Sequence, residues 1–177
     1  YKRQVYGSFL QSKMYTAGVN CLDCHDKHTM KIKVQGNGLC LQCHNSEVYQ
    51  KQSHIRHDLN SSAGQCVSCH MPQTTFMGVD ARRDHSFKVP QPELSTKFET
   101  PNVCNSCHTS QSSSWSADII NKRREGIAPP KSIPDDFVAL MHNGTLPIAQ
   151  HFALIDNNKL SIIVRASAIA MLPYSVE

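Results

Sequence analysis

The cysteines of this chain all occur in pairs with a single spacing. Eight cysteines form four C-x-x-C pairs, and a histidine follows each pair directly. Because histidine makes up 10 of the 177 residues, four such placements by chance have a probability of about 10⁻⁵. The twelve residues of the four motifs are Cys21, Cys24 and His25; Cys40, Cys43 and His44; Cys66, Cys69 and His70; and Cys104, Cys107 and His108.

This motif constrains the chain covalently, because C-x-x-C-H is the attachment signature of c-type haem. The two thiols form thioethers with vinyl groups on one edge of a porphyrin, and the adjacent imidazole reaches the iron from one face. The sequence therefore predicts four covalently attached haem c groups, held by the twelve motif residues. The expected iron ligands from the motifs are His25, His44, His70 and His108.

Paired cysteines can also bind zinc or form disulfides. Fifteen residues separate Cys24 from Cys40, which fits a zinc-ribbon spacing. The next two gaps, of 22 and 34 residues, do not repeat that spacing, and zinc gives no reason for a histidine after every pair. A disulfide framework is disfavoured because a C-x-x-C disulfide closes a very short loop and restrains the unfolded chain little.

Aliphatic residues are unevenly distributed along the chain. Residues 1 to about 111 are poor in Leu, Ile and Val and rich in Cys, His, Ser, Gln and Asn. Their own side chains cannot offset the entropy of ordering the segment, whereas four large apolar macrocycles would fill its core. We expect a mainly α fold with much irregular coil, in which a tetrahaem cytochrome c domain (residues 1–111) wraps around its haems. Short helices are expected at the motifs, and no alternating run is convincing enough for a sheet.

The last part of the chain has a different character. Residues 112–133 begin with a serine-rich stretch and end with a proline-rich one, and we expect them to be a linker. Residues 134–142, 147–156 and 161–172 are predicted helices. Together they form a small helical-repeat-like segment, residues 134–177.

Local signals support these helices. Ser132 is the candidate cap of the first helix, Asp135 and Asp136 fall in its first turn, and Gly144 is its predicted stop. One face of the third helix carries Ile162, Ala166, Ile169 and Ala170. Repeat units of this kind cannot bury their apolar faces alone. We therefore expect the chain to be one ordered piece of a longer polypeptide.

Histidines outside the motifs are candidates for the sixth position of each iron. Four of them lie among the motifs and match the number of open positions: His28, His54, His57 and His85. We expect bis-histidine ligation with these four as distal ligands. His28 lies three residues from His25, so on a helical turn both project from the same side and cannot face one iron from opposite sides. The same argument assigns His54 and His57 to two different irons.

Other candidate ligands are less favoured. Methionine is the other common sixth ligand, and the candidates are Met14, Met30, Met71 and Met77. His142 and His151 lie in the C-terminal helices, and we expect them to be ordinary histidines or, alternatively, ligands of a haem in a neighbouring subunit.

The formal charge of +4 at pH 7 looks mildly basic. Four haems would add about eight propionates, so the loaded protein should be near neutral when oxidised and about four units more negative when reduced. A nucleic-acid partner is therefore not expected.

No run of 18 apolar residues is present, so no transmembrane segment is expected. The first 18 residues do not resemble a signal peptide, and since haem c is attached outside the cytoplasm, we expect a processed or truncated product that is periplasmic or extracellular.

The chain resembles large multihaem c-type cytochromes that carry doubled C-x-x-C-H motifs followed by tetratricopeptide or HEAT-like helices. The resemblance lies in residues 5–15, 17–19, 24–28, 36–37, 69–72, 80–87, 90–92, 100–102 and 163–168. It implies that His28, His57 and His85 are distal ligands, whereas His54 lies in a histidine-rich stretch. Family members carry a longer upstream region with further haems, so the resemblance also implies a longer natural protein. A weaker similarity is to tetrahaem subunits of extracellular cytochrome filaments.

These expectations favour electron transfer between redox partner proteins, or along an assembly of neighbouring cytochrome subunits such as a homo-oligomer or filament. The rival is a multihaem oxidoreductase, which needs an iron with an open position. All four motifs end in His, and the distal candidates suffice for all four irons. The sequence therefore predicts an electron carrier without catalytic residues.

Overall fold

The computed structural model describes residues 5–124 and 134–173. The chain divides into two compact units, Tyr1–Lys88 and Val89–Glu177. Three of the four cysteine motifs lie in the first unit, and the fourth lies in the second. The predicted haem-binding domain (residues 1–111) extends beyond the first of these units, so residues 89–111 belong to the second.

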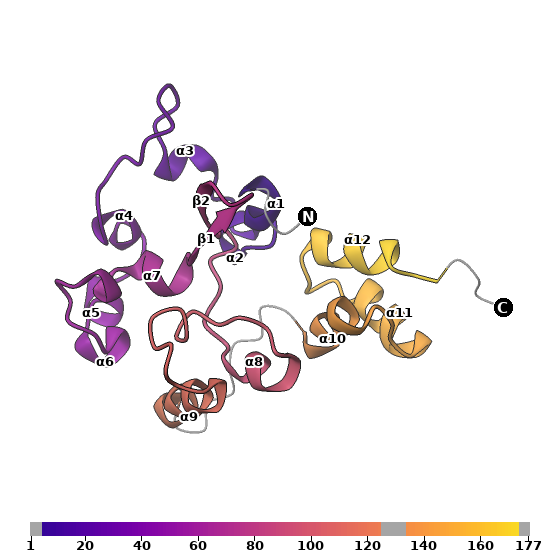
Figure 1. Ribbon diagram of the computed structural model, residues 1–177. Coiled ribbons are helices and arrows are strands. Elements are labelled where there is room, and N and C mark those ends of the chain that lie inside the picture. The colour runs from indigo at the N-terminus through magenta and orange to yellow at the C-terminus, as the bar shows by residue number, and fades with distance from the viewer. Residues whose placement is uncertain (1–4, 125–133, 174–177) are drawn as a thin grey trace. The chain divides into compact units, whose positions relative to one another are not determined.

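Short helices and long irregular connections make up the first unit (Figure 1). Its elements in chain order are α1 (Val5–Phe9), α2 (Lys13–Thr16), α3 (Cys21–Cys24), α4 (Gly38–Leu41), α5 (Ser46–Tyr49), α6 (Gln52–Ile55), the 3-10 turn η1 (Ser62–Gly64), α7 (Cys66–His70), β1 (Gln73–Phe76) and β2 (Asp80–Arg83). Helices of a single turn are marginal in isolation, so their ends must be fixed by side chains or by neighbouring chain.

Polar side chains cap several of these turns. Ser12 accepts a hydrogen bond from the Tyr15 backbone N–H at the start of α2. At α3, Asn20 accepts from the Leu22 N–H while Asp23 accepts from the Asn20 N–H at 2.8 Å, which satisfies two otherwise unpaired donors. The cap of α3 therefore fixes the start of the first cysteine motif.

A β-hairpin follows α7 and was not expected from the sequence. β1 and β2 pair antiparallel, with Gln73 opposite Arg83 and Phe76 opposite Asp80. The connection includes Met77 and Gly78, both with positive φ. Positive φ at Gly78 costs little, and tight hairpin turns need it. The strands have only four residues each, too few for a clear alternating pattern.

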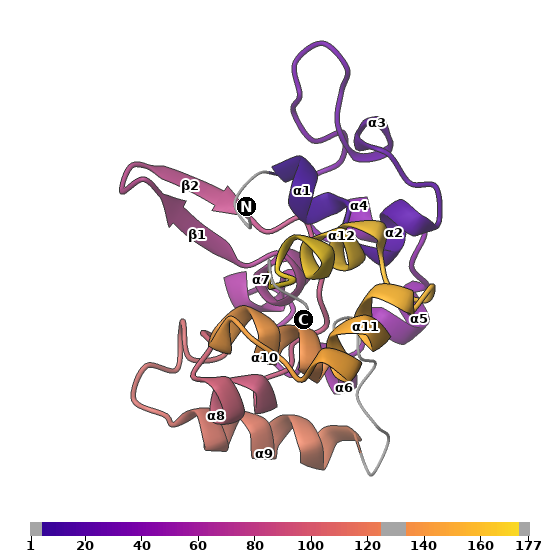
Figure 2. The ribbon, with the colours of Figure 1, turned by 90° about the vertical axis from the view of Figure 1, so that its right-hand side faces the viewer.

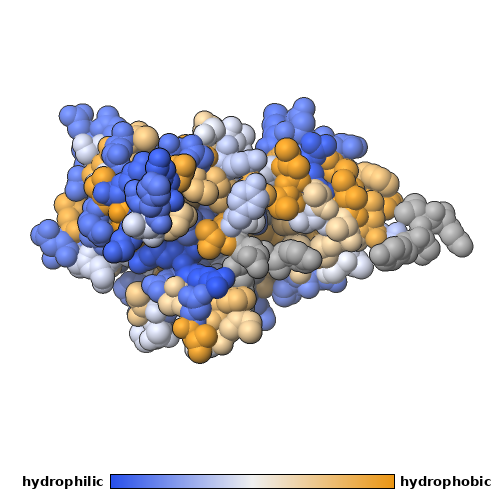
Figure 3. All heavy atoms as spheres, turned by 90° about the horizontal axis from the view of Figure 1, so that it is seen from above, coloured by the Kyte–Doolittle hydropathy of each residue, from blue (hydrophilic) through white to orange (hydrophobic). Residues whose placement is uncertain are grey.

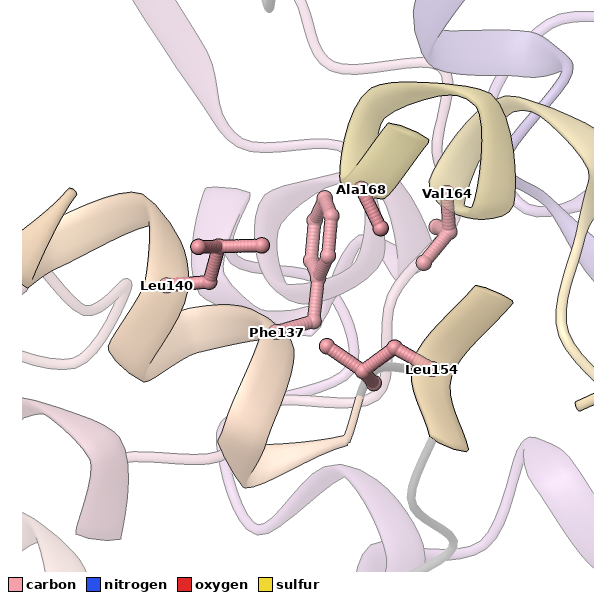
Figure 4. Close-up of a cluster of buried hydrophobic side chains, with 5 residues drawn as sticks. All are labelled: Phe137, Leu140, Leu154, Val164 and Ala168. Atoms are coloured by element: carbon pink, nitrogen blue, oxygen red, sulfur yellow. The ribbon is translucent and has the colours of Figure 1, made fainter. Parts of the chain in front are cut away.

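The second unit contains α8 (Glu93–Phe98), α9 (Ser113–Arg124), α10 (Asp135–Asn143), α11 (Ile148–Asp156) and α12 (Ile162–Ala170). The last three helices pack together, as Figure 2 shows from the side. Their buried core consists of Phe137, Leu140, Leu154, Val164 and Ala168 (Figure 4). Leu140 and Ala168 are fully buried.

The predicted C-terminal helices agree with α10, α11 and α12 within two residues at each end. Gly144 ends α10 in the left-handed conformation, and two aspartates occupy its first turn. The proposed cap Ser132 lies outside the described residues. On α12 the four apolar residues predicted to share a face do share one, but all four are exposed. Val164 and Ala168 point into the core instead.

The segment expected to be a linker begins with a helix. Residues 113–124 form α9, which packs against α8, with Ser116 and Ala117 buried. The Ser112 hydroxyl accepts from the Trp115 N–H at the start of α9. Arg124 donates to Glu93 of α8 at 3.0 Å and to the Pro90 carbonyl at 3.0 Å. The serine-rich composition pointed to a linker, but these contacts with a distant segment stabilise a helix.

The chain is mainly helical with much coil, as predicted from the sequence. Apolar and polar residues are interspersed on the face seen in Figure 3. None of the helices in the described part of the chain is long and apolar enough to cross a membrane.

Candidate functional site

Each cysteine motif forms a tight turn in the structure. The motif histidine donates its backbone N–H to the carbonyl of the first cysteine, at 2.9 Å for His25, 3.0 Å for His44 and 2.9 Å for His108. In the third motif the same residues form α7. On a helical turn residues three apart lie on the same face. Both thiols of a motif can therefore reach one edge of one ligand, which is what two thioether bonds to a single porphyrin require.

Short helices were expected at all four motifs. The first three contain or overlap α3, α4 and α7, whereas the fourth is a sequence of turns between α8 and α9. Its turn is held by a hydrogen-bonded network of side chains. Asn102 donates to Ser95 at 3.0 Å and to Asn105 at 2.7 Å. Ser116 of α9 donates to Asn105 at 3.0 Å, so this network ties the fourth motif to both α8 and α9.

All eight cysteines lie in the described residues, and none of them forms a disulfide. Cys21, Cys43 and Cys107 are exposed, and the others are partly buried. Burial raises the pKa of Cys24 and of Cys104 above the usual value for a thiol. The cysteines are thus not paired as disulfides, and both members of each motif remain available for thioether formation.

Four histidines have their ring orientation fixed by a backbone carbonyl. The Nδ1 atom lies 2.6 Å from the Met30 oxygen in His25 and 2.9 Å from the Lys88 oxygen in His70. In His57 and His85 it lies 3.0 Å from the carbonyl oxygen two residues earlier in the chain. A carbonyl only accepts, so Nδ1 carries the hydrogen and a neutral ring keeps its lone pair on Nε2. Histidines that bind metals are commonly held in this way.

The carbonyl that orients His25 belongs to a turn directly after the first motif. Asp26 accepts hydrogen bonds from the backbone N–H groups of Thr29 and His28. These hydrogen bonds, chiefly that from Thr29, hold the pKa of Asp26 below its usual value. The turn brings Met30 back against His25. Met30, a candidate methionine ligand, thus contacts the motif histidine through its backbone oxygen.

Two motif histidines each face a predicted distal histidine. The ring centroids of His25 and His85 are 6.4 Å apart with an angle of 26° between the ring planes. Those of His54 and His70 are 6.2 Å apart with an angle of 12°. An imidazole nitrogen binds a metal ion at about 2.0–2.1 Å, and the ring centre lies about 1.1 Å further out. Two imidazoles on opposite sides of one ion therefore have centroids about 6.3 Å apart.

Both pairs have the spacing that one iron between two imidazoles requires. A haem iron takes only two ligands from the protein, so each proposed iron site requires one pair of histidines. Within the described ranges, no group of three or more His, Cys, Asp or Glu residues is placed to hold a metal ion by itself. The centroid spacing of these two pairs is therefore compatible with a haem iron between the rings.

Aromatic side chains lie against the other two motif histidines. Tyr49 contacts His44 and His54, with ring centroids 5.4 Å apart in both cases and nearly perpendicular planes. Trp115 lies 5.0 Å from His108, measured between ring centroids. The backbone N–H of His28 donates to Asp26 at 3.1 Å. Sequence reasoning had not selected Tyr49 or Trp115, because an aromatic residue by itself is no signal for a haem site.

The two C-terminal histidines have other contacts. His151 is 1% exposed and donates from Nε2 to the Ala168 carbonyl at 2.7 Å, which joins α11 to α12. Since its Nε2 is engaged there, His151 has a structural role in this unit. His142 lies against Phe98, with 6.1 Å between the ring centroids.

Comparisons with protein-family models, with curated proteins and with solved structures gave no match.

Proposed function

We propose that this protein is a tetrahaem c-type cytochrome that transfers electrons between redox partners or along an assembly of subunits. The observation that carries the proposal is the pairing of His25 with His85 and of His54 with His70, at the spacing expected across one iron. Each pair joins one histidine of a C-x-x-C-H motif to one histidine predicted as a distal ligand. Haem c supplies a reversible one-electron change of its iron.

The chain would hold four haems through the cysteines of its four motifs. At the first motif His25 and His85, which follows β2 in the same unit, would together hold the iron. At the third motif His70 of α7 and His54 of α6 would have these roles. The carbonyls of Met30 and Lys88 fix the tautomer of the two motif histidines and raise their basicity. His28 and His57 remain the proposed distal ligands of the other two irons.

Two histidines on one iron leave no position for a substrate. This supports an electron carrier over an oxidoreductase with an open iron, which stays the alternative if further haems precede this segment in a longer protein. A subunit of an extracellular cytochrome filament is a variant of the same function. In each case the protein would be exported to the periplasm or beyond, since haem c is attached outside the cytoplasm.

The first experiment counts and characterises the haems. In protein matured with haem supplied, a pyridine haemochrome assay should give four haems per chain, and the ferric EPR spectrum should contain low-spin signals only. A colourless protein, or zinc bound at the thiols, would refute the proposal. A high-spin signal of one iron per chain in the unmodified protein would support the oxidoreductase.

The proposed axial pairs are tested by removing one distal ligand. His85→Ala should leave four haems attached but convert one iron in four to a high-spin ferric state. His142→Ala is the matched control and should keep all four irons low-spin, because His142 contacts Phe98. If H85A stays fully low-spin, the assignment of His85 to the first motif is wrong.

A further inference from the structure

Asn37 connects two motifs that are distant in the sequence. It lies three residues before Cys40, in the Gly36–Gly38 turn, and its side chain reaches the segment before the third motif. Its Nδ2 atom donates to the Gly64 carbonyl at 3.0 Å, and its Oδ1 atom accepts from the Cys66 N–H at 2.8 Å. One partly buried amide thus uses both ends to hold the start of the third motif.

The backbone at this junction is closely packed. A Cβ atom at Gly64 would lie 2.3 Å from the Asp58 carbonyl oxygen and 2.8 Å from the Leu59 Cα atom. A Cβ atom at Gly36, whose φ is +63°, would lie 3.4 Å from the Gln65 side chain. Gly64 therefore allows residues 58–64, just before the third motif, to fold closely on themselves, and Gly36 provides a left-handed turn beside Gln65.

The first cysteines of these two motifs also contact each other. Burial, together with the neighbouring Cys66 thiol, raises the pKa of Cys40 to about 11. Cys24 of the first motif also raises the pKa of Cys40, but by less than Cys66 does. Cys40 and Cys66 occupy equivalent positions in their motifs, so they would bind equivalent edges of their porphyrins.

We propose that Asn37 is a positioning residue that clamps the second and third haem-attachment motifs together, so that the haems bound through Cys40 and Cys66 form an interacting pair. The inference rests on the proposed function and adds which two of the four haems couple most strongly. Electrons would exchange fastest within this pair, and reduction of one member would make reduction of the other less favourable, because the added charges repel.

Asn45 provides a matched control for Asn37. It is also an asparagine close to the second motif, and its Oδ1 atom accepts from the Glu47 N–H at 2.8 Å. That hydrogen bond only caps α5 and joins residues two apart. Asn45→Ala therefore removes an asparagine hydrogen bond of similar length without loosening the contact between motifs.

The experiment measures spin–spin interaction between ferric haems by EPR in the mature wild type, N37A and N45A. Haem content is determined first on the same samples. We expect four haems in each protein, a coupled pair in the wild type and in N45A, and loss of the coupling in N37A. Asn37→Asp keeps an acceptor for the Cys66 N–H but cannot donate to the Gly64 carbonyl, so it should keep more of the coupling than N37A.

Two results would refute the proposed role of Asn37. The first is coupling between haems that survives in N37A, and the second is a wild type whose four low-spin signals show no interaction. If N37A does not mature, N37D and the wild type decide: equal coupling in these two proteins would refute a role for the Gly64 hydrogen bond. A protein without four haems refutes the proposed function itself, whereas four haems without a coupled pair refute only the clamp.

Discussion

The two units of this chain build their interiors in different ways. Among the described residues of the first unit, the buried positions are Ser8, Phe9, Ser12, Gly64 and Ser86, of which only Phe9 has a large apolar side chain. In the second unit the buried apolar residues are Phe98, Ala117, Phe137, Leu140, Leu154, Val164 and Ala168. The first unit carries three of the four cysteine motifs, so the buried apolar core and the cysteine motifs are inversely distributed.

The free energies of chain ordering and of apolar burial show what this difference means for folding. Ordering a residue costs about 1–2 kcal/mol of backbone entropy, whereas burying a phenylalanine contributes about 1.5–3 kcal/mol. One buried Phe9 cannot order a unit of this length. The three-helix core of α10–α12 has an apolar interior of its own. The comparison predicts that the folding of the first unit depends on the proposed haems and that the folding of the last three helices does not.

The largest effect is therefore expected from preventing haem attachment. The chain made without haem should lose amide exchange protection throughout residues 5–88, while α10, α11 and α12 stay protected. Hydrogen exchange with peptide-level mass spectrometry compares the two units in one sample. Equal protection of the first unit with and without haem would show that its polar side chains suffice for folding.

A substitution in the aliphatic core should instead lower the stability of the second unit. Leu140 is fully buried, so Leu140→Ala should lower the free energy of unfolding of the C-terminal helices by about 2–5 kcal/mol. Ile162→Ala, at a position 79% exposed on α12, should change it by less than about 0.5 kcal/mol. Thermal melts followed by circular dichroism measure both. Loss of amide exchange protection in residues 5–88 of L140A would contradict the separation of the two units.

The same contrast determines what the sequence could predict. The helices α10–α12 were predictable because apolar periodicity and Gly144 are local signals, and a helix with its own core obeys them. The apolar face of α12 was less informative, since Val164 and Ala168 enter the core while Ile162 and Ile169 stay exposed. Periodicity shows that residues share a face, but it does not show which face meets a neighbour.

In the first unit the sequence indicates candidate attachment residues but not their arrangement. The motif spacing is set by covalent chemistry and is visible in any fold. The pairing of His25 with His85, and the two hydrogen bonds of Asn37, join residues far apart in the chain. No local pattern encodes such contacts. Asn37 lies between two glycines, which is typical of a turn, and turn composition does not reveal the two hydrogen bonds of its side chain.

A smaller effect, confined to the first unit, is expected from Gly64. Gly64→Ala forces a Cβ against the backbone of Asp58 and Leu59 and should destabilise the unit by about 1–3 kcal/mol. Gly38→Ala is the control, because its Cβ would meet only the end of the Val34 side chain at 3.1 Å, and alanine favours the helix α4. Denaturation of the haem-loaded protein, followed in the haem absorption band, compares them. Equal stabilities would argue against close packing at this junction.

The smallest effects should come from ion pairs, and they too should differ between the units. Arg124 joins α9 to α8 through Glu93, and these side chains are only 13% and 29% exposed. Arg82 and Asp80 pair within the hairpin of the first unit and are 37% and 48% exposed. Water screens the hairpin pair, so Arg82→Ala should cost less than about 1 kcal/mol.

Arg124→Ala also removes the hydrogen bond to the Pro90 carbonyl and should cost about 1.5–2 kcal/mol. Added salt separates the two cases. The stability difference between wild type and R82A should vanish at high ionic strength, whereas that between wild type and R124A should largely persist, because its carbonyl contact and partial burial do not depend on screening. Equal salt dependence would mean that the contribution of Arg124 to stability comes from charge alone and that its hydrogen bond to the Pro90 carbonyl adds nothing measurable.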